Sequence, residues 1–152
     1  MILSSIYTFI ATLCFSVIFN IRGKNLIFAA LGGGLSWYIY LLTSSHLSEH
    51  SILPFFIASV VASVYSEIMA RVLKTPVTTF IICAIIPLVP GGGMYNTMFQ
   101  SIQGNLNESL TLGLQTLSIA GAVAIGVFFV YSTSKLLFLA KRSFKMRVKK
   151  YM

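Results

Sequence analysis

Long stretches without charge set the strongest limit on how this chain can fold. The first 21 residues contain no charged side chain, and further apolar stretches follow, separated by short polar or basic segments. A helix needs about 20 mostly apolar residues to cross the hydrocarbon core of a bilayer. Charged residues make up only 9% of the chain, whereas soluble domains carry roughly 25%. The sequence therefore predicts an all-α integral membrane protein.

The pattern predicts five transmembrane helices in one membrane domain, residues 1–140, followed by a basic cytoplasmic tail at 141–152. We expect the first apolar stretch to be a retained span rather than a cleaved signal peptide, because no basic segment precedes it. The predicted spans cover residues 1–21, 26–45, 52–70, 76–103 and 110–139.

The distribution of basic residues predicts the orientation. With the N-terminus outside and the C-terminus inside, all 11 Lys and Arg residues fall on the inner side or at inner helix ends, as the positive-inside rule requires. The turns at 46–50 and 103–109 then lie outside. Because the basic tail directly follows a span, we expect it to contact anionic lipid headgroups rather than nucleic acid.

The fourth predicted span is interrupted by IIPLVPGGGMYNTM at residues 85–98. Pro87 and Pro90 have no N–H, so they cannot donate to the carbonyls of Cys83 and Ile86 as helical residues would. Unpaired backbone polar groups do not face lipid, and they persist only inside protein or beside a wet cavity. We therefore expect this broken helix to be buried in protein or to line a cavity.

Three glycines follow the prolines and leave room for a ligand to approach the backbone. We expect the helix to restart near Met94, where its first free N–H groups would favour an anion such as a carboxylate. Broken helices of this kind form substrate sites in secondary transporters. The alternative is a kink that leads into a helix on the outer membrane surface, so whether residues 94–103 cross the membrane stays open. The candidate substrate-binding residues are Pro87, Pro90, Gly91, Gly92, Gly93, Tyr95 and Asn96.

Small residues recur at every fourth position in three predicted spans, with Ala30 and Gly34 forming the row of the second. Such rows let helix backbones approach closely in a membrane, so we interpret them mainly as packing surfaces. A second interpretation is that the polar row of the third span lines a water-filled path. The rows are Ala58, Ala62, Ser66 and Ala70 beside Ser59, Ser63, Glu67 and Arg71 in the third span, and Ser118, Ala122 and Gly126 in the fifth.

Glu67 is the only acidic residue within a predicted span, and Arg71 follows four residues later. A carboxylate inside the bilayer is costly, and an acid placed before a base at this spacing forms a favourable pair on a helix. One interpretation is a local ion pair near the inner membrane interface. The other is a coupling or gating role for Glu67 and Arg71, because ionisable residues inside membranes often relay protons or mark transport pathways.

Residues 46–50 spell H-x-x-E-H, a pattern found in one class of zinc proteases. Zinc chemistry would need a further ligand and both histidines on one helix, whereas this motif is predicted to lie in a short outer turn. We interpret it as a solvated turn and predict no metal site, no cofactor and no catalytic residue. The sequence also has no nucleotide loop or nucleophile elbow, so we do not expect an enzyme.

The motif at the break resembles the threonine/serine exporter family in its short form. The segment TPVTTFIICAIIPLVPGGGMYNTM at 75–98 carries the resemblance, because the family places an I-P-x-x-P-G segment there, followed by a Tyr. FNIRGKNLIFAALGG at 19–33 and SIAGAVAIG at 118–126 are similar to the family as well. The short form corresponds to the C-terminal membrane half of long exporters, or to the small subunit of two-component exporters such as those associated with succinate.

The resemblance implies a subunit of a secondary transporter that exports a small carboxylate metabolite, either threonine and serine or a dicarboxylate such as succinate. It implies the bacterial cytoplasmic (inner) membrane as the location, and a hetero-oligomer with a larger exporter subunit. Pro87, Pro90, Gly91 and Tyr95 match the family's motif. Two alternatives stay open at this point: a structural or assembly subunit that does not transport, and a channel.

Overall fold

The computed structural model describes residues 1–47 and 52–150, with side chains as far as Leu136. Within these residues the chain consists of helices joined by turns, without a β-strand. The helices are α1 (Ile2–Ile18), α2 (Lys24–His46), α3 (Leu53–Leu73), α4 (Thr78–Ile85), the 3₁₀ helix η1 (Ile86–Leu88), α5 (Gly91–Ile102) and α6 (Leu106–Lys150).

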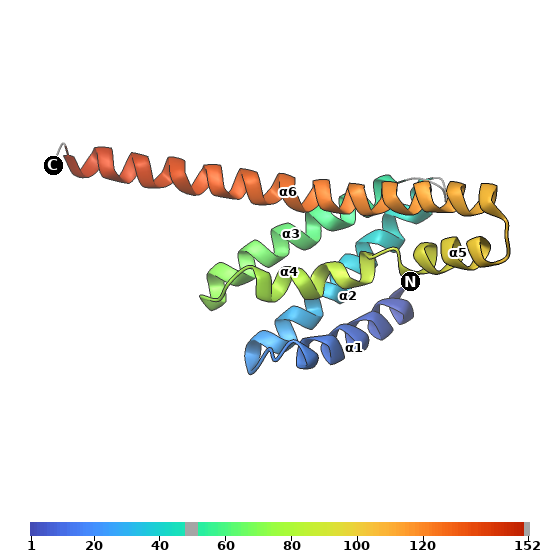
Figure 1. The fold of residues 1–152 in the computed structure, drawn as a ribbon. Helices are drawn as coiled ribbons and strands as arrows, with labels where there is room; N and C mark the ends of the chain where they lie inside the picture. Colours follow the sequence, from blue (N-terminus) through green and yellow to red (C-terminus); the bar gives the residue numbers. More distant parts are fainter. Residues whose placement is uncertain (48–51, 151–152) are drawn as a thin grey trace.

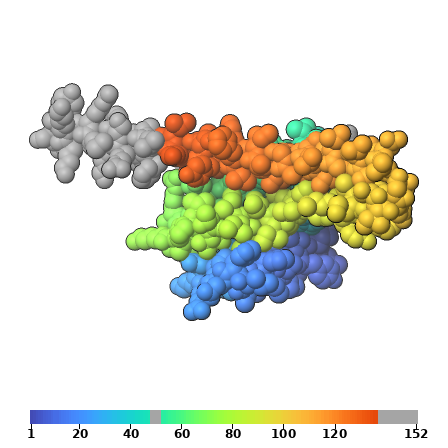
Figure 2. Space-filling view, in the orientation of Figure 1, coloured from blue at the N-terminus to red at the C-terminus, as the bar shows by residue number. Residues whose placement is uncertain are grey.

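The helices run alongside one another in tiers (Figure 1). α2 packs on α1, α3 and α4, while α3 packs on α2, α4 and α6. On the face shown in Figure 2, α6 forms the upper tier, α4 the middle tier, and α1 with the start of α2 the lower tier. α5 packs mainly on α6 and lies with it at one end of the molecule. The broken helix therefore joins the centre of the bundle to a hairpin at its edge.

Within the part of the chain that the structure describes, three helices are long and apolar enough to cross a membrane alone: α2, α3 and the Leu106–Leu136 part of α6. Thr78–Leu88 and Gly91–Ile102 together qualify as a fourth, broken span with a bend of 49°. α1 is apolar but has only 17 residues. An all-α membrane protein is thus confirmed, with the break where the sequence predicts it. The total of five spans and their orientation stay predictions.

Several helix ends differ from the predicted spans: α6 continues to Lys150, past the predicted end at 139, and α3 to Leu73 rather than 70. Two of the differences have local reasons. α1 ends at Ile18 rather than at residue 21, because Asn20 adopts a left-handed conformation with φ of 58° that a helix cannot contain. α6 begins at Leu106 rather than at residue 110, two residues after Gly104, whose φ of 81° allows the tight turn. Glu108 then falls in the first turn of α6, where a negative charge is favourable.

The basic turns lie at one end of the bundle. The α1–α2 turn carries Arg22 and Lys24, and the end of α3 with the following turn carries Arg71 and Lys74. Figure 1 places these turns together, on the side toward which the C-terminal part of α6 extends, and opposite the α5–α6 turn. We call this side the basic end. Its formation follows from the up-and-down course of the helices.

Close packing between helices uses the small residues. A Cβ at Gly126 of α6 would collide with Ser59 Oγ and would lie 3.2 Å from the carbonyl oxygen of Phe56 on α3. A Cβ at Gly33 of α2 would lie 2.8 Å from the Cβ of Thr12 on α1. The predicted packing role is confirmed on α3, where the buried small residues are Ala58, Ser59, Ala62, Ser63, Ser66 and Ala70.

The hydroxyl groups on this face of α3 are occupied within the helix itself. Ser63 donates to the carbonyl of Ser59 at 2.7 Å, and Ser66 donates to the carbonyl of Ala62 at 2.8 Å. A serine hydroxyl satisfied in this way can be buried without water. The interpretation of the polar row as the lining of a water-filled path is contradicted at Ser59 and Ser63, which are buried against neighbouring helices.

We expect Gly126→Leu to destabilise the protein, because the new side chain would be forced against α3. Overpacking of this kind costs about 1–3 kcal/mol, and thermal unfolding in detergent would show it as a lower midpoint. The matched control is Gly121→Leu, earlier on α6, where a Cβ meets no atom within 4 Å. Equal stability of the two variants would contradict the close α3–α6 contact.

Candidate functional site

The break in the fourth helix consists of one tight turn. α4 ends at Ile85, η1 follows, and α5 begins at Gly91 with Pro90 at its N-cap. The N–H of Val89 donates to the carbonyl of Ile86 at 3.2 Å. Pro90 cannot supply the helical donor to Ile86, but the carbonyl is not left unpaired, because the tighter 3₁₀ turn brings in the N–H of the residue before Pro90.

The sequence predicted that the helix restarts near Met94. In the structure α5 begins three residues earlier, at Gly91. Residues in the first turn of a helix need no intrahelical partner for their N–H groups, and all three glycines have negative φ. The N–H of Gly91 contacts the carbonyl of Val89 at 2.7 Å. The N–H groups of Gly92 and Gly93 have no hydrogen-bond partner among the residues that the structure describes. The positive end of α5 therefore opens at the break.

The three glycines differ in their surroundings. A Cβ at Gly91 or Gly92 would meet no atom within 4 Å, and both residues are exposed. A Cβ at Gly93 would lie 2.5 Å from Thr116 Oγ1 and 3.3 Å from its Cγ2, so Gly93 marks the close contact of α5 with α6. Packing therefore explains Gly93, whereas the described part of the chain gives neither a steric nor a conformational reason for Gly91 and Gly92.

Ser36 of α2 supplies polar support to the end of α4. Its Oγ lies 2.7 Å from the carbonyl oxygen of Ala84 and 2.9 Å from that of Gly33, and its side chain is fully buried. Sequence reasoning missed Ser36. The signal was present, because Ala29, Gly33 and Ser36 follow the spacing of one helix face, and all three are buried.

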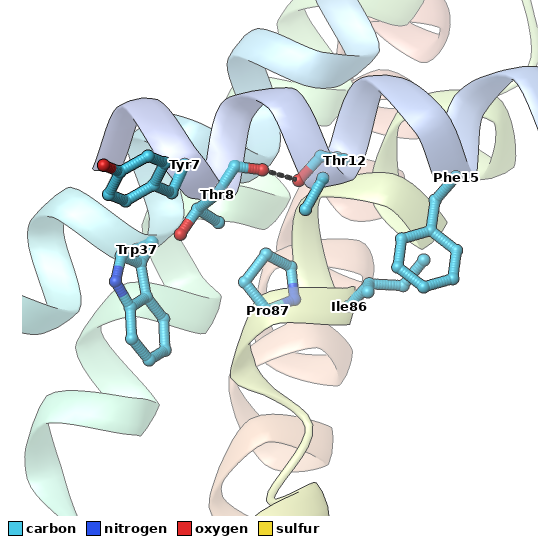
Figure 3. A pocket seen from close by; sticks show the side chains of 8 residues that line it. Tyr7, Thr8, Thr12, Phe15, Trp37, Ile86 and Pro87 are labelled. Atoms are coloured by element: carbon cyan, nitrogen blue, oxygen red, sulfur yellow. Dashed lines mark hydrogen bonds between the residues drawn. The ribbon is translucent and has the colours of Figure 1, made fainter. Parts of the chain in front are cut away.

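A cavity of about 340 Å³ lies between the break, α1 and α2. In Figure 3, Pro87 and Ile86 face α1, and Trp37 of α2 stands beside them. Thr12 uses its hydroxyl to donate to the carbonyl of Thr8 at 2.7 Å. The walls are mostly apolar and come from Tyr7, Thr8, Ala11, Thr12, Phe15, Trp37, Ile86 and Pro87.

A second cavity, of about 460 Å³, lies on the other side of the break against α6. Val89 and Pro90 form its wall on the break, and Val123 and Phe128 lie among the residues of α6 that face them. Pro87 lines the first cavity and Pro90 the second. The single turn between α4 and α5 therefore separates two hollows, and each is bounded by one of the two prolines.

Tyr95 and Asn96 lie on the exposed surface of α5. Tyr95 is 68% exposed and its ring stacks on Phe99 at 6.1 Å between centroids. Neither Tyr95 nor Asn96 lines either cavity beside the break. The structure therefore brings the prolines and glycines together, and it leaves the two polar side chains on a face that no described part of the chain covers.

Glu67, Arg71 and Ser134 form a polar cluster between α3 and α6. Arg71 Nη2 lies 3.2 Å from Glu67 Oε2 and donates to Ser134 Oγ at 2.7 Å. The Ser134 hydroxyl donates to the same Glu67 oxygen at 2.8 Å. The Glu67 side chain is 16% exposed and that of Arg71 58%. The predicted ion pair is thus present, and it joins two helices through Ser134.

Ser134 was not among the residues predicted to form a site. The small-residue row of the last span could have pointed to Ser134. The row of Ser118, Ala122 and Gly126 continues at the same four-residue spacing to Val130 and Ser134. Gly126 and Val130 are buried against the bundle. Extending the row would have placed Ser134 on the face of α6 that meets α3.

The H-x-x-E-H segment forms no metal site that the structure describes. His46 is the last residue of α2, while Glu49 and His50 lie outside the described residues. Among the described residues no group of three His, Cys, Asp or Glu side chains could hold a metal ion.

The apolar helices and the broken span define a multi-pass membrane protein. The chain belongs to the threonine/serine exporter family: the family model described as "Threonine/Serine exporter, ThrE" matches residues 4–133. This match covers the break and both candidate clusters except Ser134, and it confirms the resemblance seen in the motif. The family consists of transporters, so the chain is a component of membrane transport rather than an enzyme. Comparisons with curated proteins and with solved structures gave no match.

We expect Ser36→Ala to destabilise the protein, because the buried carbonyl of Ala84 would lose a donor that water cannot replace. Leaving one buried polar group unsatisfied costs about 1–3 kcal/mol, measurable as a lower thermal midpoint in detergent. Ser45→Ala is the matched control on the same helix, since Ser45 is exposed and donates only to Leu42 of its own helix. A Ser36→Ala variant as stable as this control would show that Ala84 does not depend on Ser36.

Proposed function

We propose that this chain is one subunit of a secondary transporter that exports a small carboxylate metabolite across the bacterial cytoplasmic membrane. The cargo is threonine or serine, or a dicarboxylate such as succinate. Membership of the exporter family supports transport as the activity. The observation that carries the proposed site is the opening of α5 at the break, where Gly91 and Gly92 are exposed without a neighbour.

Glycine in these two positions points to a contact outside the chain. Neither φ nor packing within the described residues requires glycine at Gly91 or Gly92, although glycine is a poorer helix former than alanine. A bare backbone lets another molecule come close. The unpaired N–H groups of Gly92 and Gly93 lie at the positive end of α5, which favours an anion. A carboxylate meets both conditions.

The cavities beside the break support a role for the prolines as well. Pro87 and Pro90 each border one hollow next to the α5 terminus. The apolar walls of these hollows suit the carbon chain of a metabolite, while the glycine N–H groups suit its charged end. Tyr95 and Asn96 belong to the proposed site only if the cargo or the partner reaches the exposed face of α5.

A larger exporter subunit is the proposed partner. No residue of α5 is buried within the described part of the chain, although this helix forms half of the broken span. Its apolar residues, among them Met94, Met98 and Ile102, are exposed. A second subunit that covers α5 would enclose the opening at the break. The basic tail at 141–152 is proposed to contact anionic lipid headgroups beside the basic end.

A structural subunit is the second candidate, and the contact of Ser36 with Ala84 favours it. A break whose carbonyl is capped from a neighbouring helix can serve as a packed kink. Efflux from proteoliposomes separates the two roles: export at full rate by the larger subunit alone would identify this chain as a scaffold. Flux that neither saturates nor follows a coupling gradient would identify a channel.

We expect Gly91→Leu to lower the efflux of radiolabelled threonine or succinate at least tenfold in proteoliposomes that contain both subunits. The new side chain would occupy the space through which the cargo reaches the backbone. Expression and thermal stability should not change, because a Cβ at this position meets no atom of the chain within 4 Å.

Gly121→Leu is the matched control for that experiment, since it places the same bulk in equally open surroundings on α6. It should export at the native rate. Native efflux by Gly91→Leu, with both variants folded, would contradict a cargo site at the start of α5.

The coupling or gating role of Glu67 and Arg71 remains part of the proposal. If Glu67 carries the coupled proton, Glu67→Gln should export with a rate that no longer depends on pH, because glutamine cannot titrate. Ser134→Ala is the control, as it removes a hydrogen bond to the same carboxylate and keeps the carboxylate itself. An unchanged rate and pH profile in Glu67→Gln would exclude coupling through this residue.

A further inference from the structure

We propose that the cavity between α3 and α6 at the basic end is a second carboxylate site, in which Arg71 exchanges the carboxylate of Glu67 for that of the cargo. The cavity has a volume of about 230 Å³ and is bordered by Glu67, Arg71 and Ser134. The inference rests on the proposed export of a carboxylate. It adds a binding step at the end of the bundle opposite the α5–α6 turn.

Arg71 has unused capacity to bind an anion. A guanidinium group carries five N–H donors in a planar fork, and the contacts of Arg71 with Glu67 and Ser134 both use Nη2. Its Nε and Nη1 have no partner among the described residues. The side chain is 58% exposed, so a carboxylate can reach this open side and bind through two parallel hydrogen bonds.

The existing ion pair is weak enough to exchange. Arg71 contacts only one oxygen of Glu67, at 3.2 Å, whereas strong charge-assisted bonds are about 2.7–2.9 Å long. Arg71 is the exposed member of this pair, so water competes with Glu67 for its donors and the contact contributes less than a buried one would. A carboxylate that engages Arg71 through two oxygens would therefore compete well with Glu67.

The charge at this end also draws an anion. The sequence contains three acidic residues, of which Glu108 lies in the first turn of α6 at the other end and Glu49 lies outside the described residues. Glu67 is thus the only acid at the described part of the basic end, which also holds Arg22, Lys24 and Lys74. Such an excess of positive charge raises the local concentration of anionic solutes.

The walls of the cavity suit a small metabolite. Its volume corresponds to about eight water molecules at roughly 30 Å³ each. Val64, Ile68 and Val130 provide apolar walls for a short carbon chain. Ser134 can turn its hydroxyl from Glu67 to an incoming carboxylate, whereas Thr133 already donates to carbonyls of its own helix.

A brace between α3 and α6 is the competing explanation, and the two make different predictions. A brace is weakened by removing either partner, so variants of Glu67 and Arg71 would have effects of the same sign. In an exchange site Arg71 is the receptor and Glu67 the competitor. Removing Arg71 therefore weakens carboxylate binding, while removing the charge of Glu67 strengthens it.

The test is equilibrium binding of radiolabelled threonine and succinate to the full chain in lipid nanodiscs, alone and with the larger subunit. We expect Arg71→Gln to weaken binding at least tenfold and Glu67→Gln to strengthen it about threefold or more. Arg71→Lys should lie between native and Arg71→Gln, because lysine keeps the charge and loses the two-pronged contact. Lys74→Gln is the matched control, since it removes a neighbouring exposed charge that does not border the cavity.

Thermal midpoints of the same variants separate folding from binding. Losses of binding in both Glu67→Gln and Arg71→Gln, with lowered midpoints, would identify a brace and overturn the proposal. Absence of saturable binding by the native chain in both preparations would overturn it as well. If Gly91→Leu abolishes efflux while Arg71→Gln binds and exports like the native chain, export through the break stands and the second site is wrong.

Discussion

A main-chain carbonyl inside a membrane needs a hydrogen-bond donor, and this requirement organises the centre of the molecule. A proline-interrupted helix cannot supply every donor itself. The tight turn of η1 provides a donor for the carbonyl of Ile86, and the hydroxyl of Ser36 on α2 donates to the carbonyl of Ala84. A kink that would be costly in lipid is thereby held between helices. The N–H groups left without partners lie just beyond it, on the first turn of α5.

Small side chains make this support possible. Ser36 can reach Ala84 because α2 and α4 approach closely, and α2 in turn packs against α1 where Gly33 meets Thr12. Helices in lipid gain little from burying apolar side chains, so close van der Waals contact and shared hydrogen bonds hold them together. Most of the described hydroxyl groups donate to carbonyls of their own helix. The few that donate to a neighbouring helix, such as Ser36 to Ala84, link the helices of the bundle.

The sequence predicted features that depend on composition and local chemistry. Apolar length identified the membrane helices, and the prolines located the break, because both properties act within a few residues. The pattern along the sequence could not show which residues of different helices contact each other. Ser36 and Ser134 read as ordinary small residues until α4 and α3 are placed beside them. The distinct surroundings of Gly91 and Gly93 likewise depend on where α6 lies.

The isolation of α5 has a consequence for how the protein moves. This helix buries no residue, contacts mainly α6, and begins with three glycines, so few interactions oppose its local unfolding. Elements with little buried contact have the lowest opening free energies and exchange their amide hydrogens first. Among the described helices, α5 thus has little buried contact to oppose its opening, and it lies directly after the turn that η1 and Ser36 hold in place.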